Sequence, residues 1–320
     1  MKKTIFLCLI CIFCSTILYG LTTDDFEFSI SLVGIEKEED LKEAGWQLFE
    51  TTPSGKQKTE LTIPAEIQGK PVNSIGVFGL YGCDNLVTLN IPATIREIFG
   101  QSPNKLKSYS VDKNNPFFCS VDGILYNKLK TELISCPRDK ENIPTIPNTV
   151  QVIKEYAFSG CEHLEKITIP SSVQEIGESA FSSYNLNEIF VDKKNNNYCS
   201  VDGILYNKNV STLIYCPKQK KAPVIPNTVN KIDNYAFNNY GDVRSFQDNS
   251  ITIPASVTSI GNSAFSGCKV GSIIIERNVP PAIEEKTFDF FFGTIKVPSG
   301  TVNAYKTAPL WGKYADKIVE

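Results

Sequence analysis

The stretch IPNTVQVIKEYAFSGCEHLEKITIP, residues 146–170, decides the fold of this 320-residue chain. It begins and ends on the same dipeptide, at Ile146-Pro147 and Ile169-Pro170, and the two copies are 23 residues apart. Further copies stand at Ile63-Pro64, Ile91-Pro92, Ile225-Pro226 and Ile253-Pro254. Two of the steps between them measure 28 residues, which is 23 plus an insertion of five. The chain is therefore built from an internal repeat.

Apolar residues keep fixed offsets within the repeat. Seven and twelve residues after the first isoleucine stand Ile153 and Phe158 in one copy, and Ile260 and Phe265 in another. A single helix or hairpin cannot hold such offsets over a whole repeat. A coil can, because each turn places the same residue at the same inward position and stacked turns bury one continuous core. The offsets predict a solenoid.

Each turn is expected to contain two short extended pieces. The alternation Leu-x-x-Ile-x-Ile over residues 164–169 is typical of a strand, and Pro170 ends it because a prolyl nitrogen cannot donate to a ladder. Residues 173–176 form the second piece. Gly177 then allows a turn with positive φ, and Phe181 enters the core from a single helical or 3₁₀ turn.

The repeat Ile-x-Ile-Pro-x-x-Val-x-x-Ile-Gly-x-x-Ala-Phe-Ser-Gly-Cys resembles the 23-residue leucine-rich repeat of the BspA-like (treponemal-type) bacterial surface proteins. Residues 146–161, 169–181 and 253–268 match it best. The resemblance covers residues 61–320 and implies a curved leucine-rich-repeat solenoid, mostly of short parallel β-strands with 3₁₀ or helical turns. It weakens at residues 96–105, which lack Ala-Phe, and at Leu80-Tyr81, where the aromatic residue is displaced.

A longer period lies over the short one. Residues 119–128 (CSVDGILYNK) recur identically at 199–208, a shift of 80 that also carries Cys136 onto Cys216. We expect four parts, namely a signal peptide at 1–20, an N-terminal cap at 21–60, a solenoid at 61–297 with β-hairpin inserts near 112–142 and 192–221, and a C-terminal cap at 298–320. In the N-terminal cap, Phe26–Ile30 and Trp46–Phe49 are expected as strands.

The N-terminus has the features of an export signal. Two lysines follow Met1, and residues 5–18 are an unbroken run of apolar residues, Cys, Ser and Thr. This run is too short to span a bilayer comfortably and fits the apolar region of a signal peptide. A lipoprotein signal is the alternative, with Cys8, Cys11 or Cys14 as the modified residue. No later segment is apolar for long enough to span a membrane, so we expect a secreted, cell-surface or periplasmic protein.

Composition excludes several classes of function. Lys and Arg number 32 and Asp and Glu 35, so nothing indicates a basic face for nucleic acid. His163 is the chain's one histidine, which excludes a multi-histidine metal site. It lies beside Cys161, but other repeats hold Tyr at the cysteine position and Asn at the histidine position, which favours packing over catalysis. We expect the protein to be no enzyme and to bind no metal or cofactor. Calcium binding at the Asn-rich turns after Asp112 and Asp192 is the minor alternative hypothesis.

The insert cysteines have a regular spacing. Cys119 and Cys136 are 17 residues apart, and so are Cys199 and Cys216. In an exported protein each pair could form a disulfide. If Leu205 pairs with Leu213 in the hairpin, the register is about three residues off, so free, half-buried thiols remain the alternative.

The remaining candidate for a functional site is the exposed surface of the strands. The outward positions of the Leu-x-x-Ile-x-Ile strands line one face, and those that we single out for binding are Thr88, Lys166, Thr168, Glu188, Phe190 and Ile274. Solenoids bind other macromolecules through such extended faces. The hairpin tips near Lys128–Lys130 and Lys208–Val210 are the competing surface.

Two hypotheses of function follow. The first is an exported recognition module, and the family resemblance implies protein or glycoprotein partners such as extracellular matrix or another bacterial cell. The second is a structural protein of the envelope or periplasm, without a host ligand.

Overall fold

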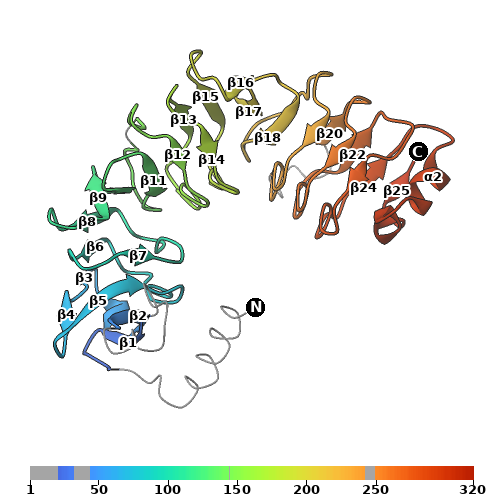
Figure 1. The fold of residues 1–320 in the computed structure, drawn as a ribbon. Helices are drawn as coiled ribbons and strands as arrows, with labels where there is room; N and C mark the ends of the chain where they lie inside the picture. Colours follow the sequence, from blue (N-terminus) through green and yellow to red (C-terminus); the bar gives the residue numbers. More distant parts are fainter. Residues whose placement is uncertain (1–20, 32–43, 144, 242–248) are drawn as a thin grey trace, which may run out of the picture. The chain divides into compact units, whose positions relative to one another are not determined.

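The computed structural model describes residues 21–31, 44–143, 145–241 and 249–320 (Figure 1). The chain divides into two compact units, Met1–Lys140 and Glu141–Glu320, here called unit 1 and unit 2. Each unit is a β-solenoid of short strands with few helices, so the predicted solenoid is confirmed. The predicted signal peptide and the segment between the first two strands, residues 32–43, lie outside the described residues.

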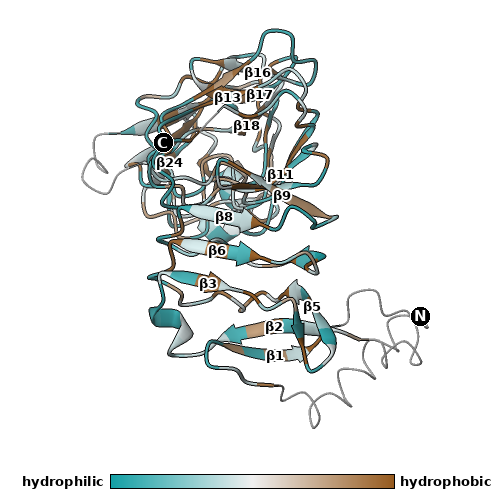
Figure 2. Cartoon of the chain, turned by 90° about the vertical axis from the view of Figure 1, so that its left-hand side faces the viewer, coloured by the Kyte–Doolittle hydropathy of each residue, from teal (hydrophilic) through white to brown (hydrophobic). Residues whose placement is uncertain are grey.

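Unit 1 contains three groups of paired strands. Its elements are β1 (Phe26–Ile30), β2 (Trp46–Thr51), a 3₁₀ turn η2 (Gly55–Gln57), β3 (Glu60–Thr62), β4 (Glu66–Ile67), β5 (Lys70–Ile75), β6 (Thr88–Ile91), β7 (Glu97–Ile98), β8 (Ser108–Val111), β9 (Phe118–Val121), β10 (Ile124–Asn127) and β11 (Glu132–Ser135). The order β1-β2-β5-β4, with β7 also on β5, makes one sheet. Strands β3, β6 and β8 stack in parallel (Figure 2), and β9, β10 and β11 form an antiparallel meander.

Unit 2 repeats this plan. Its elements are β12 (Val152–Ile153), β13 (Lys166–Ile169), β14 (Glu175–Ile176), β15 (Glu188–Val191), β16 (Tyr198–Val201), β17 (Ile204–Asn207), β18 (Thr212–Tyr215), β19 (Lys231–Ile232), β20 (Ser250–Ile253), β21 (Ser259–Ile260), β22 (Ser272–Ile275), β23 (Ala282–Ile283), β24 (Thr294–Lys296), α2 (Val302–Thr307), η4 (Trp311–Tyr314) and β25 (Ile318–Val319). Parallel rows run β12-β14, β13-β15 and β20-β22-β24-β25. A further row runs β16-β17-β18-β19-β21-β23.

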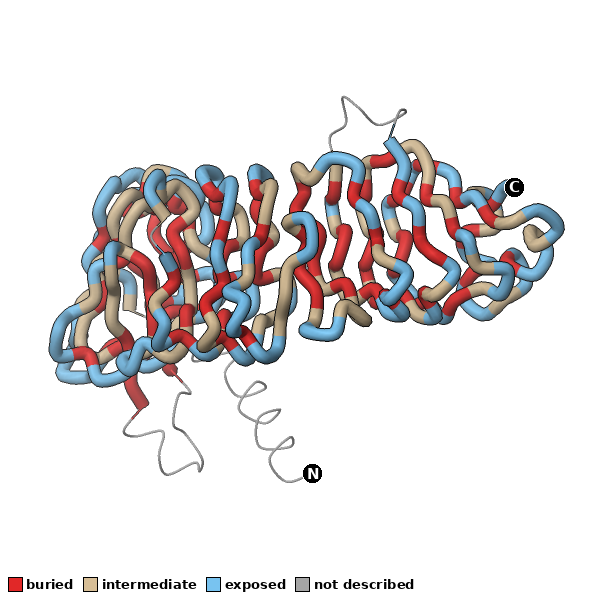
Figure 3. The backbone as a smooth tube through the Cα atoms, turned by 90° about the horizontal axis from the view of Figure 1, so that it is seen from above, coloured by how far each residue is buried: buried red, intermediate tan, exposed pale blue. Residues whose placement is uncertain are grey.

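The turn at 164–181 shows why these residues fold this way. Ile167 and Ile169 of β13 point inward and are 6% and 0% exposed, while Lys166 and Thr168 face solvent. Pro170 follows directly and ends the strand. Because every turn repeats this alternation, buried and exposed residues recur at the same positions along each unit (Figure 3).

The corner of each turn differs in detail from the prediction. The positive φ lies at Ser179 (54°), and Gly177 has an ordinary negative φ. Gly177 is needed for space instead, since a Cβ there would lie 2.3 Å from the backbone nitrogen of Glu155 in the preceding turn. Phe181 is carried by isolated i to i+3 turns, such as Ala180 N to Gly177 O at 3.2 Å, and no continuous helix forms.

Aromatic rings from successive turns stack along the core of unit 2. Phe237 and Phe265 are parallel with centroids 5.0 Å apart, and Phe288 continues the stack at 5.5 Å. On the other side of the second insert, Phe158 and Phe181 stack at 5.8 Å. Aromatic pairs of this kind add about 0.5–1.5 kcal/mol each beyond the apolar area that they bury.

Leu80 takes the place of the core phenylalanine in unit 1. It is 9% exposed, whereas the neighbouring Phe78 and Tyr81 are 60% and 73% exposed. The aromatic residue is displaced from the inward position, as expected, and the smaller aliphatic Leu80 fills that position.

The inserts are three-stranded meanders and not simple hairpins. In the second insert β17 pairs with β16 on one side and β18 on the other, and a bulge sets Leu205 opposite Tyr215 and Tyr206 opposite Leu213. The expected pairing of Leu205 with Leu213 is wrong, because three consecutive residues of β17, Ile204 to Tyr206, are all buried and the strand has no solvent face.

The meander also explains the state of the cysteines. Cys199 lies on β16 opposite Tyr206, and Cys216 follows β18, so β17 stands between them. Two strand spacings amount to about 10 Å, whereas disulfides join Cα atoms about 4.4–6.8 Å apart. Cys119 and Cys136 are arranged in the same way around β10. None of the seven cysteines in the described residues is part of a disulfide, so the disulfides suggested by the spacing are not present.

Candidate binding surface

The structure places the six candidate residues in three separate strand rows. Thr88 pairs with Ser108 between β6 and β8 of unit 1. Lys166, Thr168, Glu188 and Phe190 stand together on β13 and β15 of unit 2. Ile274 lies on β22, between Thr252 of β20 and Lys296 of β24. Four of the six therefore share one surface, which we call the β13–β15 face.

The β13–β15 face combines an ion pair with an exposed aromatic ring. Lys166 Nζ lies 2.8 Å from Glu188 Oε2, and this hydrogen bond raises the pKa of Lys166. Two residues further along each strand, Thr168 stands opposite Phe190, whose side chain is 44% exposed. The face thus offers one charge pair, one hydroxyl and one apolar ring within two residues of each strand.

A hollow of about 290 Å³ opens on this face. Lys166, Thr168 and Phe190 line it, together with Ile143, Thr145, Ile146 and Ile167. Apolar walls with a few polar groups are typical of surfaces that receive a partner's side chain. The sequence identified the three outward residues from strand alternation, but not the wall formed by Ile143, Thr145 and Ile146.

Cys161 and His163, the pair considered above for catalysis, lie in different surroundings. Cys161 is fully buried in the core, whereas His163 is exposed. Among the residues that the structure describes, no group of three or more His, Cys, Asp or Glu could hold a metal ion.

A buried asparagine holds each of the Asn-rich turns through hydrogen bonds. Asn195 is fully buried, and its Nδ2 donates to the carbonyl oxygens of Pro170 and Val173 at 2.9 and 3.0 Å. Its Oδ1 accepts from the backbone nitrogens of Asn197 and Tyr198, both at 2.8 Å. All of its hydrogen-bonding groups are used, and Asn115 repeats the arrangement in unit 1. The asparagine side chain thus fastens the insert to the preceding turn.

Two exposed aromatic groups were not predicted. In unit 1 the large apolar side chains Phe49, Val77, Phe78, Tyr81 and Phe99 are 44–73% exposed, at the strand ends of β2, β5 and β7 and in the corner after β5. In unit 2 Phe290 and Phe292 are 75% and 77% exposed. Departures from the repeat were the available signal, since Phe78 and Tyr81 flank the altered Ala-Phe position.

The family description "BspA type Leucine rich repeat region" matches the chain in six copies, over residues 15–111, 139–218 and 210–306. The chain belongs to the BspA-type leucine-rich-repeat family. Proteins of this family are typically non-catalytic interaction modules found at the bacterial cell surface or secreted. No helix in the described part of the chain has the length and apolar character to cross a membrane.

Solved structures that are similar to this chain include several leucine-rich-repeat proteins. A leucine-rich cell surface protein from Faecalibacterium prausnitzii is 22% identical over 88% of this chain and 89% of its own, with a TM-score of 0.42. A leucine-rich-repeat protein from Eubacterium ventriosum is 22% identical over 86% and 70%, with a TM-score of 0.48. The T. pallidum leucine-rich-repeat protein is 15% identical over 93% and 95%, with a TM-score of 0.33. No curated protein matches the chain.

Proposed function

We propose that the chain is an exported, non-catalytic recognition module that binds a protein or glycoprotein through the β13–β15 face. The observation that carries the proposal is the hollow of about 290 Å³ beside the exposed ring of Phe190 and the Lys166–Glu188 pair. Partners suited to this face present an apolar or aromatic group for the hollow and charges of both signs around it. Ligands on extracellular matrix or on another bacterial cell meet this requirement.

A charge exchange on the face tests the proposal. In Lys166→Glu with Glu188→Lys the ion pair is kept in reverse, so the fold survives while the charge pattern that a partner meets is inverted. We expect binding to matrix glycoproteins and to bacterial cells to fall at least tenfold, and Phe190→Ser to act in the same direction. Lys56→Glu with Glu50→Lys, which reverses a Lys–Glu ion pair of unit 1 at 2.6 Å and likewise leaves the net charge unchanged, is the matched control. If the exchange leaves binding to every candidate partner unchanged, the β13–β15 face is not the binding surface.

Location is tested by protease shaving of intact cells, followed by mass spectrometry of the released peptides. Peptides cut near Lys128 or Lys208, in the turns of the two inserts, are expected if the chain faces the exterior. Release only after the envelope is opened would favour a structural role in the envelope or periplasm and would contradict adhesion.

A further inference from the structure

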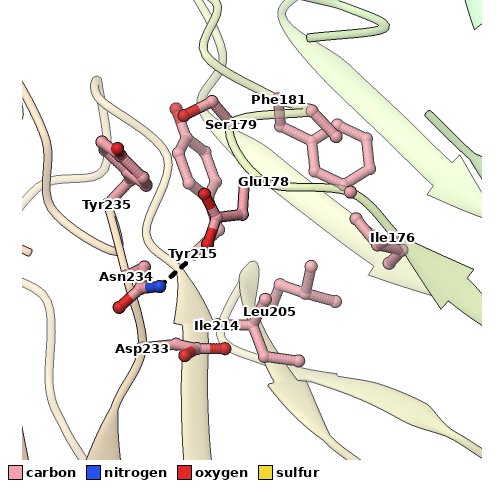
Figure 4. A pocket seen from close by; sticks show the side chains of 12 residues that line it. Ile176, Glu178, Ser179, Phe181, Leu205, Ile214, Tyr215, Asp233, Asn234 and Tyr235 are labelled. Carbon is pink, nitrogen blue, oxygen red and sulfur yellow. Dashed lines mark hydrogen bonds between the residues drawn. The ribbon is translucent and has the colours of Figure 1, made fainter. Parts of the chain in front are cut away.

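The second insert leaves a cavity of about 70 Å³ in unit 2. Glu178 and Ser179 border it from the turn before the insert, Asp233 and Tyr235 from the turn after it, and Tyr215 from the end of β18 (Figure 4). A single water needs only about 10–15 Å³ of such space. The cavity is therefore large enough for a small organic head group.

The hydroxyl of Tyr215 lacks a partner inside the protein. The side chain is 6% exposed, its ring lies 6.3 Å from that of Phe181, and its oxygen is buried without a hydrogen bond. In the first insert the corresponding position is Ser135, whose hydroxyl bonds that of Tyr109 at 3.0 Å. The second insert has Ile189 in place of that tyrosine, so the hydrogen bond of the first insert has no counterpart here. A buried hydroxyl in this state destabilises the fold unless something from outside satisfies it.

The residues that line the cavity favour the binding of a cation. No basic side chain lines the cavity. Glu178 accepts a hydrogen bond from Asn234 Nδ2 at 2.8 Å and forms no ion pair with a described residue, whereas Asp233 is paired with Lys231 at 3.0 Å. The rings of Phe181, Tyr215 and Tyr235 add π-faces, which attract ammonium and guanidinium groups.

We propose that this cavity binds the head group of an organic cation, an ammonium or guanidinium group. The Tyr215 hydroxyl accepts a hydrogen bond from it, the Glu178 carboxylate serves as counter-ion, and the aromatic rings form the walls. A basic side chain of a partner protein and a free amine share this chemistry. The site uses none of the residues of the β13–β15 face and goes beyond the proposed function.

Saturation-transfer NMR with methylguanidinium tests the proposal, and N-methylurea is the neutral probe of the same shape. We expect saturation of the methylguanidinium methyl group, little for N-methylurea, and a several-fold loss in Tyr215→Phe and in Glu178→Gln. Tyr206→Phe is the matched control, because Tyr206 also carries a buried hydroxyl without a partner but does not line the cavity. A comparison of N-acetylarginine amide with methylguanidinium distinguishes a partner protein's side chain from a free amine as the natural ligand. Tighter binding of the amide indicates a protein side chain.

Equal signals from the two methyl probes would overturn the proposal, and so would equal losses in Tyr215→Phe and Tyr206→Phe. Thermal melting of each variant reports whether the fold is kept. The charge exchange at Lys166 and Glu188 is expected to leave the methylguanidinium signal unchanged, so failure of this site and failure of the β13–β15 face are distinguishable.

Discussion

Phe290 stands at a backbone position that suits other residues better. Its φ is 56°, in the left-handed region, and the aligned residues in other turns of unit 2 are Gly160, Asn239 and Gly267. Glycine and asparagine adopt this region at low cost, whereas a bulky side chain adds roughly 1–2 kcal/mol of strain. Its ring is 75% exposed, so packing returns little of this energy.

Replacing Phe290 by asparagine is therefore expected to stabilise unit 2 by about 0.5–1 kcal/mol. The exposed ring contributes few contacts that could be lost, and the left-handed strain is relieved. Urea denaturation followed by circular dichroism measures the change. Phe292→Asn is the control, because Phe292 is as exposed but has no positive φ, and it should be neutral. A Phe290→Asn protein less stable than the parent would show that the ring packs in solution.

At the scale of the element, the insert is fastened by one asparagine. Asn195 bridges the carbonyl groups of Pro170 and Val173 to the backbone of the insert. The fastening depends on this residue, while the side chain of Asn196 beside it is exposed and forms no hydrogen bond with a described residue.

Asn195→Asp is expected to lower the free energy of unfolding by about 3 kcal/mol, because two donors are lost and a carboxylate faces two carbonyl oxygens in a buried place. Asn196→Asp changes charge equally at an exposed position and should shift stability by less than about 0.5 kcal/mol. Chemical denaturation of both variants gives the comparison. Equal effects would mean that charge, and not the lost donors, is responsible.

The sequence predicted inward positions well, because every turn must place its apolar residues on one core and the repeat averages over many turns. It therefore located Ile167, Ile169 and Phe181 correctly. Contacts between one turn and its neighbours could not be predicted from the repeat in this way. The bulge at Leu205, the space reserved by Gly177 and the missing partner of Tyr215 depend on a neighbour many residues away, and local periodicity carries no information about that neighbour.

At the scale of the whole molecule, a stack of turns needs its two ends covered. In unit 2 β25 pairs with β24 and covers its edge, and Trp311, 1% exposed, closes the core while its Nε1 donates to Pro281 O at 2.8 Å. In unit 1 β2 pairs with β5, and β1 pairs with β2. Covered edges keep a solenoid from pairing with other chains.

Trp311→Ala is expected to lower the free energy of unfolding of unit 2 by about 3–5 kcal/mol and to promote association, because the last ring of the aromatic stack is lost and the edge of β24 loosens. Hydrogen exchange at β24 and light scattering measure the two effects. Val319→Ala, at a partly exposed site of β25, should change stability by less than about 1 kcal/mol. Unchanged exchange at β24 in Trp311→Ala would contradict the closing role of Trp311.

The thiols are expected to react slowly and in a fixed order. Burial raises the pKa of Cys119 and of Cys199, and the thiolate is the reactive form. A raised pKa leaves less thiolate at a given pH, so alkylation of these two should keep accelerating above the ordinary thiol pKa of about 8.5. Cys136 and Cys216, which are buried, should label only on unfolding. Iodoacetamide pulses with mass spectrometry measure this, and an intrachain disulfide in the purified chain would refute the arrangement.

In each of the two inserts, an asparagine side chain accepts the hydrogen bonds of the backbone nitrogens in the insert's own turn. Asn127 Oδ1 accepts from the backbone nitrogens of Thr131 and Glu132, and Asn207 does the same for Ser211 and Thr212. A segment that closes its own hydrogen bonds can be duplicated in a gene together with its adjoining turns, without compensating changes elsewhere. One copy can then preserve the architecture while the other accumulates substitutions, and the difference between Ser135 and Tyr215 is one that such redundancy permits.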